Sequence, residues 1–304
     1  MKKICLFLLM FVLFFGLCTC GIFSAEAVQT TSVSTYAGLS NLFSTANSTA
    51  DDYIVNITGN FKITGQMKLT NAGSTVTLIP SGANRTITAS FTSGTNSVTG
   101  NPAFYLTAGT LNLGNPNGGS SYTLTLDGGN ASARKGALVR VQSDGAVVNM
   151  YDGMIIQNNV ASGVSVNGGT FNMHGGVIQN CQNASTGTGG GGVVVTVSTP
   201  NAGGFNMSGG TIQNCTATYY GGGVGVDYNA TFNMTGGTIK DCTAGYYGGG
   251  VYIYNRGTSY TPTFNMSGGT ITNCSAVYYG GGFASLPGNS MTTNNAVFNM
   301  TGAV

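Results

Sequence analysis

Charged side chains are scarce in this sequence, at 6% of its 304 residues against roughly 25% in ordinary globular proteins. The 10 basic and 8 acidic residues leave a formal net charge of +2. A surface with so little charge of either sign lacks the basic patch that would attract nucleic acid or an anionic membrane. We therefore expect no nucleic acid among the partners, and no membrane contact beyond an N-terminal signal or anchor.

Acidic groups and histidine are also few for hydrolytic chemistry. Glycoside hydrolysis needs two carboxyl groups across one groove, and calcium-dependent elimination needs clustered acidic ligands with a basic proton acceptor. The best catalytic candidates are Arg140, Asp144 and Asp152, although aspartates scattered in turns explain the pattern more simply. His174, the single histidine, reads as a turn substitution. We expect no catalytic site, no metal site and no cofactor.

Tryptophan is absent and there are only 6 prolines, whereas glycine is abundant at 50 residues. Threonine, serine and asparagine are also frequent. This composition disfavours helix and favours short strands with glycine-rich turns. We expect almost no helix after the N-terminal segment.

The N-terminus has the pattern of an export signal. Two lysines precede an apolar run over residues 4–23, and Ala25 and Ala27 are small residues at the positions that a signal peptidase reads. Cleavage after Ala27 makes residues 1–27 a signal peptide and the chain a secreted or cell-surface protein. Because the run is about long enough to span a bilayer, an uncleaved anchor is the alternative. A lipoprotein site at Cys18 or Cys20 fits less well, because the residues before each cysteine are unfavourable.

A repeat runs through the second half of the sequence. It reads T-F-N-M-[ST]-G-G-T-I-x-N-C-x-A followed by Y-Y-G-G-G-V, and a weaker copy starts at Val148. Its aromatic residue recurs at intervals of 34, 27, 32 and 34 residues, at Phe171, Phe205, Phe232, Phe264 and Phe298. A period of this size is typical of a stacked, solenoidal architecture.

Each repeat predicts three short strands separated by bends. In residues 231–237, Phe232 and Met234 share one face and Asn233 takes the other, so the apolar pair should point inward. Residues 238–241 predict a second strand with Ile239 inward, and the segment after the glycine triplet predicts a third. Three strands per turn without helices predict an all-β, right-handed parallel β-helix, in which each strand pairs with its equivalent in the next coil.

The parts of the chain after the signal are expected to differ. Residues 28–147 contain strand-like runs without the consensus, which we interpret as an N-terminal cap and irregular coils. Residues 148–304 form regular repeats that are incomplete at the C-terminus. Because the sequence stops at FNMTGAV, partway through a coil, we interpret it as a fragment of a longer protein.

Stacking places equivalent residues in columns about 4.8 Å apart. One column lies at a bend, where side-chain amides can hydrogen-bond along the stack, and comprises Asn180, Asn214, Asp241 and Asn273. The next comprises Cys181, Cys215, Cys242 and Cys274. We interpret both as structural ladders, because small thiols suit a packed interior and a linear column does not suit tetrahedral zinc. Disulfides Cys181–Cys215 and Cys242–Cys274 are the alternative, although about 4.8 Å is wide for a disulfide Cβ distance of about 3.8 Å.

Tyrosine pairs recur over three consecutive repeats. Because adjacent strand residues point to opposite faces, one tyrosine of each pair should lie at least partly outside. A strip of flat, amphipathic rings suits sugar rings or a protein partner. The candidate ligand-binding residues are Tyr219, Tyr220, Tyr246, Tyr247, Tyr278, Tyr279, Tyr252 and Tyr254. Aromatic stacking that only shields the coils is the alternative.

The strings FNMSGGTI, NC and GGGV resemble the repeats of bacterial right-handed β-helix surface proteins, and are similar to the GGAI and FxxN repeats of polymorphic outer-membrane proteins. The resemblance is clear over about residues 148–304 and weaker over 50–147. It implies an exported, surface-displayed adhesin, which we expect to be a monomeric solenoid that binds glycans or proteins of a host or neighbouring cell.

Two other functions compete with adhesion. Pectate-lyase-like enzymes share the fold, so a polysaccharide lyase or glycoside hydrolase is one alternative. The NTD, GHG and RIK motifs of polygalacturonase-like enzymes do not occur in the sequence. A purely structural surface stalk is the other alternative, since the repeat specifies a fold more strongly than a function.

Overall fold

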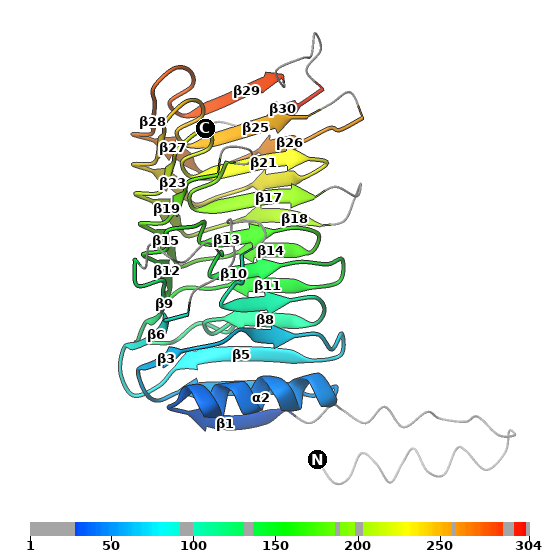
Figure 1. Cartoon of the computed structure of the whole chain (residues 1–304), viewed down its shortest axis with the longest axis vertical. Coiled ribbons are helices and arrows are strands. Elements are labelled where there is room, and N and C mark those ends of the chain that lie inside the picture. Colours follow the sequence, from blue (N-terminus) through cyan, green and yellow to red (C-terminus); the bar gives the residue numbers. More distant parts are fainter. Residues whose placement is uncertain are drawn as a thin grey trace, which may run out of the picture.

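The computed structural model describes residues 28–91, 100–130, 136–185, 189–197, 203–256, 259–287 and 295–301. The signal predicted over residues 1–27 lies outside these ranges. The described residues wind into a right-handed parallel β-helix, as the repeat predicted (Figure 1). No helix within these ranges combines the length and apolar character of a membrane span.

Four parallel sheets run along the stack. The ten-stranded sheet contains β1 (Gln29–Val33), β2 (Asp52–Ile57), β5 (Thr75–Pro80), β8 (Thr110–Leu113), β11 (Val147–Met150), β14 (Thr170–Met173), β18 (Gly204–Met207), β22 (Thr231–Met234), β26 (Thr263–Met266) and β30 (Val297–Met300). The β3–β27 sheet contains β3 (Phe61–Ile63), β6 (Arg85–Ala89), β9 (Leu124–Asp127), β12 (Met154–Gln157), β15 (Val177–Gln179), β19 (Thr211–Gln213), β23 (Thr238–Lys240) and β27 (Thr270–Thr272).

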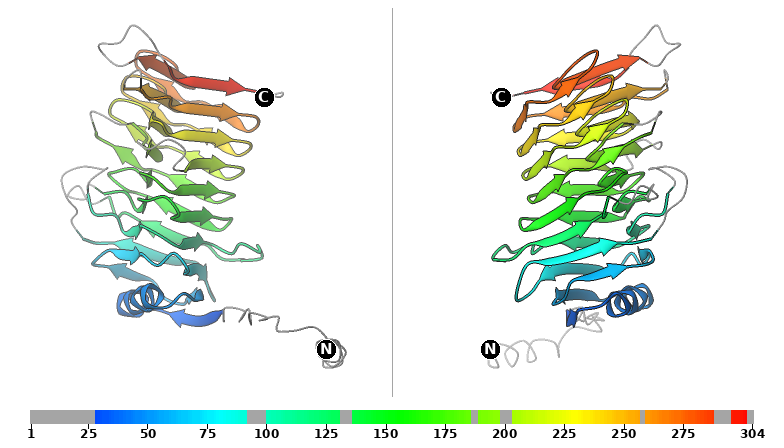
Figure 2. Two further views of the ribbon diagram at one scale, coloured as in Figure 1. Left: turned by 90° about the vertical axis from the view of Figure 1, so that its right-hand side faces the viewer. Right: turned by 60° about the vertical axis from the view of Figure 1, so that its left-hand side comes forward.

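In the regular repeats, the strands of the other two sheets lie shortly before and directly after the glycine triplets. The β4–β29 sheet contains β4 (Met67–Leu69), β7 (Phe104–Leu106), β10 (Val139–Val141), β13 (Val164–Val166), β17 (Val193–Val197), β21 (Val224–Tyr228), β25 (Val251–Asn255) and β29 (Phe283–Pro287). A short sheet contains β16 (Gln182–Asn183), β20 (Thr216–Ala217), β24 (Thr243–Ala244) and β28 (Ser275–Ala276). The chain therefore visits three sheets per coil, and adds the short fourth one in the regular repeats (Figure 2).

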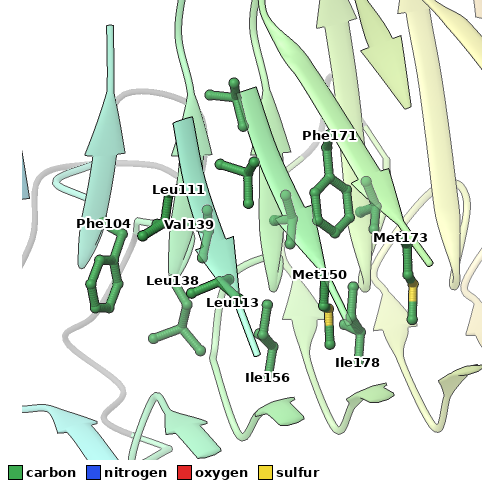
Figure 3. Packing of buried hydrophobic residues seen from close by; sticks show 14 of the residues in the cluster. Phe104, Leu111, Leu113, Leu138, Val139, Met150, Ile156, Phe171, Met173 and Ile178 are labelled. Carbon is green, nitrogen blue, oxygen red and sulfur yellow. The ribbon is translucent and has the colours of Figure 1, made fainter. Parts of the chain in front are cut away.

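The register between coils follows the repeat. Phe171 pairs with Phe205, Phe205 with Phe232, and Phe232 with Phe264. Ring centroids along this column lie 5.1, 4.7 and 4.8 Å apart. All four rings belong to the buried core. Figure 3 shows Phe171 in the interior with Met150, Met173 and Ile178 nearby. Burial of each such side chain contributes about 1.5–3 kcal/mol.

The described residues contain one helix, in agreement with the expectation of almost no helix. α2 (Tyr36–Ser48) lies at the N-terminal end of the stack (Figure 1). The Thr35 side chain caps it by accepting a hydrogen bond from the Gly38 N–H at 3.2 Å. Its buried residues, Leu39, Leu42, Phe43 and Ala46, follow helical spacing. The spacing of these apolar residues is visible in the sequence, but the overall composition, which disfavours helix, does not indicate it.

Each glycine of the Gly221–Gly223 triplet has a different structural reason. Gly221 has a φ of +63°, a conformation that L side chains rarely adopt. A Cβ on Gly222 would meet the carbonyl oxygen of Gly249 in the next coil. A Cβ on Gly223 would lie 2.7 Å from Cγ2 of Ile239. Gly221 is therefore required by its backbone conformation, and Gly222 and Gly223 by the close approach of the next coil.

Candidate functional site

The segments just before the glycine triplets fold over the outside of the β4–β29 sheet. Val251 and Ile253 of β25 belong to the interior core, whereas Tyr252 between them faces outward. The ring of Tyr220 lies against Tyr252, with 4.8 Å between the ring centroids and 16° between the planes. Tyr220 also forms a parallel bridge with Tyr247. The turn segments therefore add an aromatic layer to this sheet.

The structure brings together all eight tyrosines predicted from the sequence. We call Tyr219, Tyr220, Tyr246, Tyr247, Tyr252, Tyr254, Tyr278 and Tyr279 the tyrosine surface. The first column has centroid distances of 4.9 Å for Tyr219–Tyr246 and 5.1 Å for Tyr246–Tyr278. The second has 5.7 Å for Tyr220–Tyr247 and 5.6 Å for Tyr247–Tyr279. Tyr252 and Tyr254 stack on Tyr220 and on each other, which makes the cluster continuous.

The sequence suggested a strip of flat rings, whereas several of these rings stack on one another. Tyr246 lies between Tyr219, whose ring stacks on it at 16°, and Tyr278, whose ring is tilted at 37°. Tyr246 is nevertheless 37% exposed. Tyr278 and Tyr279 are more exposed, at 58% and 63%.

Sequence reasoning missed an ion pair beside the tyrosine surface. Arg256 Nε donates to Asp227 Oδ2 at 2.7 Å, and the Arg256 guanidinium lies 4.7 Å from the ring centroid of Tyr254 and 5.1 Å from that of Tyr228. Such cation–π contacts contribute about 0.5–1 kcal/mol at exposed sites and more when desolvated. The pair could have been predicted from the strand register, because Asp227 pairs with Tyr254, two residues before Arg256.

Burial dominates the electrostatics of this corner. Asp227 is 2% exposed, and burial raises its pKa to about 6, against the opposing effect of Arg256. Burial likewise raises the pKa values of the Tyr252 and Tyr220 phenols. Burial therefore favours the neutral phenol at Tyr252 and Tyr220.

The predicted cysteine column lies inside the coils as free thiols. Cys181, Cys215 and Cys242 are buried, and Cys274 is partly exposed. Each donates to the backbone carbonyl two residues earlier, as Cys242 Sγ does to Lys240 O at 3.2 Å. Hydrogen bonding with Cys215, together with burial, raises the pKa of the Cys242 thiol to about 12. Cys181, Cys215 and Cys242 therefore pack as part of the interior core.

The amide ladder occupies a different column from the one predicted. Asn180, Asn214, Asp241 and Asn273 have φ angles of 52–54°, a left-handed conformation that asparagine and aspartate tolerate. Among the described residues, this column shows one amide bond, from Asn180 to Asn158 at 3.5 Å. The continuous ladder comprises Asn112, Asn149, Asn172, Asn206, Asn233, Asn265 and Asn299, with each amide donating to the preceding coil at 2.8–2.9 Å after the first.

The three catalytic candidates lie on different parts of a coil. Arg140 is buried in β10, where burial lowers its pKa. Asp144 and Asp152 lie before and after β11, so the four residues of that strand, about 13 Å in length, separate them. Asp152 lines a shallow groove of about 350 Å³, and no other carboxylate lines it. In the described ranges, no group of three or more His, Cys, Asp or Glu side chains could hold a metal ion.

Comparisons with protein-family models, with curated proteins and with solved structures found no match for this chain.

Proposed function

We propose that this chain is a secreted or surface-displayed β-helix adhesin, and that its tyrosine surface binds a glycan or protein of a host or neighbouring cell. The observation that carries the proposal is the continuous cluster of eight tyrosines contributed by three coils. Stacking immobilises the rings before any partner binds, so little further side-chain entropy is lost on binding. The resemblance to bacterial surface repeats supports the same function.

A stalk would need no such cluster on the outside of its coils. Tyr246, in the middle one of the three coils, is 37% exposed, whereas Tyr252 of the same cluster is 2% exposed. Aromatic residues of this kind are enriched among the few residues that supply most binding energy at interfaces. The rigid coil then displays these anchors in fixed register along one side.

The test measures binding of the chain to a panel of cell-surface glycans and proteins. We expect saturable binding that weakens roughly 30-fold or more when Tyr246, Tyr278 and Tyr279 are replaced by Ala, since loss of an aromatic anchor costs about 2 kcal/mol or more. The Tyr122→Ala variant is the matched control, because Tyr122 is 40% exposed and lies outside the tyrosine surface. Circular dichroism of each variant must match that of the parent. No binding by the parent, or equal binding by both variants, would refute the proposal and favour the stalk.

A further inference from the structure

The three turn segments that carry the tyrosine pairs contain no charged residue. They read TATYY over residues 216–220, TAGYY over 243–247 and SAVYY over 275–279. Thr216, Thr243 and Ser275 are exposed, and the hydroxyl oxygens of Thr243 and Ser275 lie 3.2 Å apart. A row of aliphatic hydroxyls therefore accompanies the tyrosines from coil to coil.

The phenols repeat with the same period. Tyr219, Tyr246 and Tyr278 follow one another at centroid distances of 4.9 and 5.1 Å, close to the strand spacing of about 4.8 Å. Tyr246 lies between the stacked ring of Tyr219 and the tilted ring of Tyr278, so a ligand running along the column beside it would contact ring edges and hydroxyl groups. Each hydroxyl can both donate and accept a hydrogen bond. The column is thus a regular series of neutral hydrogen-bonding groups parallel to the solenoid axis.

The charges around these segments are few and of both signs, since Lys240 and Asp241 precede the second segment and an ion pair lies beside Tyr254. Asp227 and Arg256 form a hydrogen-bonded pair at 2.7 Å, and the Asp227 carboxylate is buried. A charged ligand would lose hydration on this surface without gaining an opposite charge from the three segments. The complementary ligand is uncharged, rich in hydroxyl groups and repetitive along its own length.

We infer that the tyrosine surface takes an uncharged polysaccharide chain lengthwise along the solenoid axis, with the rims of Tyr219, Tyr246 and Tyr278 hydrogen-bonding to successive parts of the chain. This inference rests on the proposed function and specifies its ligand. The threonine and serine hydroxyls recur in the same three segments. Three coils then act as three linked contacts for one chain, so affinity accumulates with ligand length.

The first test measures affinity against ligand length. The probes are graded series of neutral gluco-, manno-, galacto- and xylo-oligosaccharides from the disaccharide upward, with polygalacturonate as the charged comparison. We expect one neutral series to bind with an affinity that rises with length and levels off once the ligand spans the three segments. Failure of every neutral series, or preference for polygalacturonate, overturns the inference.

The second test separates hydroxyl recognition from contact with the rings. Changing Tyr219, Tyr246 and Tyr278 to Phe keeps the stack and removes the three hydroxyls, and should weaken the longest bound oligosaccharide by about tenfold per lost hydrogen bond. Tyr122→Phe is the control and should bind as the parent does. The comparison is with the variant described above in which Tyr246, Tyr278 and Tyr279 are replaced by Ala. If the phenylalanine variant binds as the parent does and this alanine variant does not bind, the inference is overturned and the proposed adhesin function remains. Unchanged binding by both variants refutes both.

Discussion

At the scale of single residues, the most unusual group is a carboxylate placed where water cannot reach it. Asp227 accepts hydrogen bonds from the Tyr228 N–H at 2.8 Å and from Arg256 at 2.7 Å. These partners favour the charged form, yet burial outweighs them and raises the pKa to about 6. The protonated form is therefore stabilised by folding relative to the unfolded chain.

This pKa shift predicts the sign of a pH effect. The pKa rises from 3.8 to about 6, so the folded chain binds the proton more tightly between these values. The free energy of unfolding should fall as pH rises from about 4 to about 6, by about 3 kcal/mol relative to an Asp227→Asn variant, which has no such titration. Denaturant unfolding at a series of pH values measures this difference. Parallel pH profiles for the two proteins would show that Asp227 does not titrate in this way.

At the scale of one element, the outer face of the ten-stranded sheet is joined by amides. Asn233 in β22 donates to Asn206 Oδ1 and accepts from Asn265, both at 2.8 Å. Each asparagine is thus donor to one coil and acceptor to the next, so the ladder is directional. The asparagine amide supplies both groups, whereas the carboxylate of an aspartate offers acceptors alone.

Replacing Asn233 by Asp should therefore destabilise the fold by about 1–3 kcal/mol, because two oxygen atoms then face each other at Asn206. The matched control is Asn273→Asp at the bend, where Asp241 already occupies the equivalent position of the preceding coil. That change should alter stability by less than about 0.5 kcal/mol. Urea unfolding of the two variants measures both. Equal losses would mean that the ladder contributes nothing specific.

At the scale of the whole molecule, the fold is a one-dimensional stack in which each coil contacts its neighbours. Interior side chains are supported from both sides, as Phe232 is by Phe205 and Phe264. Stability is then distributed as interfaces between coils. The contribution of a residue depends on whether coils cover it on both sides.

Two identical truncations test this distribution. Phe232→Ala leaves a cavity between two coils and should cost about 3–5 kcal/mol. Phe298→Ala should cost clearly less, because Phe298 is already 40% exposed. Thermal and denaturant unfolding of both variants give the comparison. A similar loss for both would contradict a stack stabilised interface by interface.

The sequence alone determined the coil. Alternation of Phe232, Asn233 and Met234 separates inside from outside over a few residues, and the repeat period carries that pattern from one coil to the next. This is short-range information, which a strand expresses wherever it lies. Three strands of the regular coil and their parallel pairing were therefore predictable, whereas the short fourth strand, such as β24 (Thr243–Ala244), was not predicted.

Only the tertiary structure decided how the columns act on one another. Asn180 and Asn206 are both outward polar residues in the sequence, but one occupies a left-handed bend and the other joins the amide ladder. The ion pair of Asp227 with Arg256 joins consecutive coils across 29 residues. The tyrosines stack face to face because their turns fold back over the sheet at the coil spacing. These contacts depend on distances between neighbouring coils. Those distances cannot be derived from the order of residues within one coil.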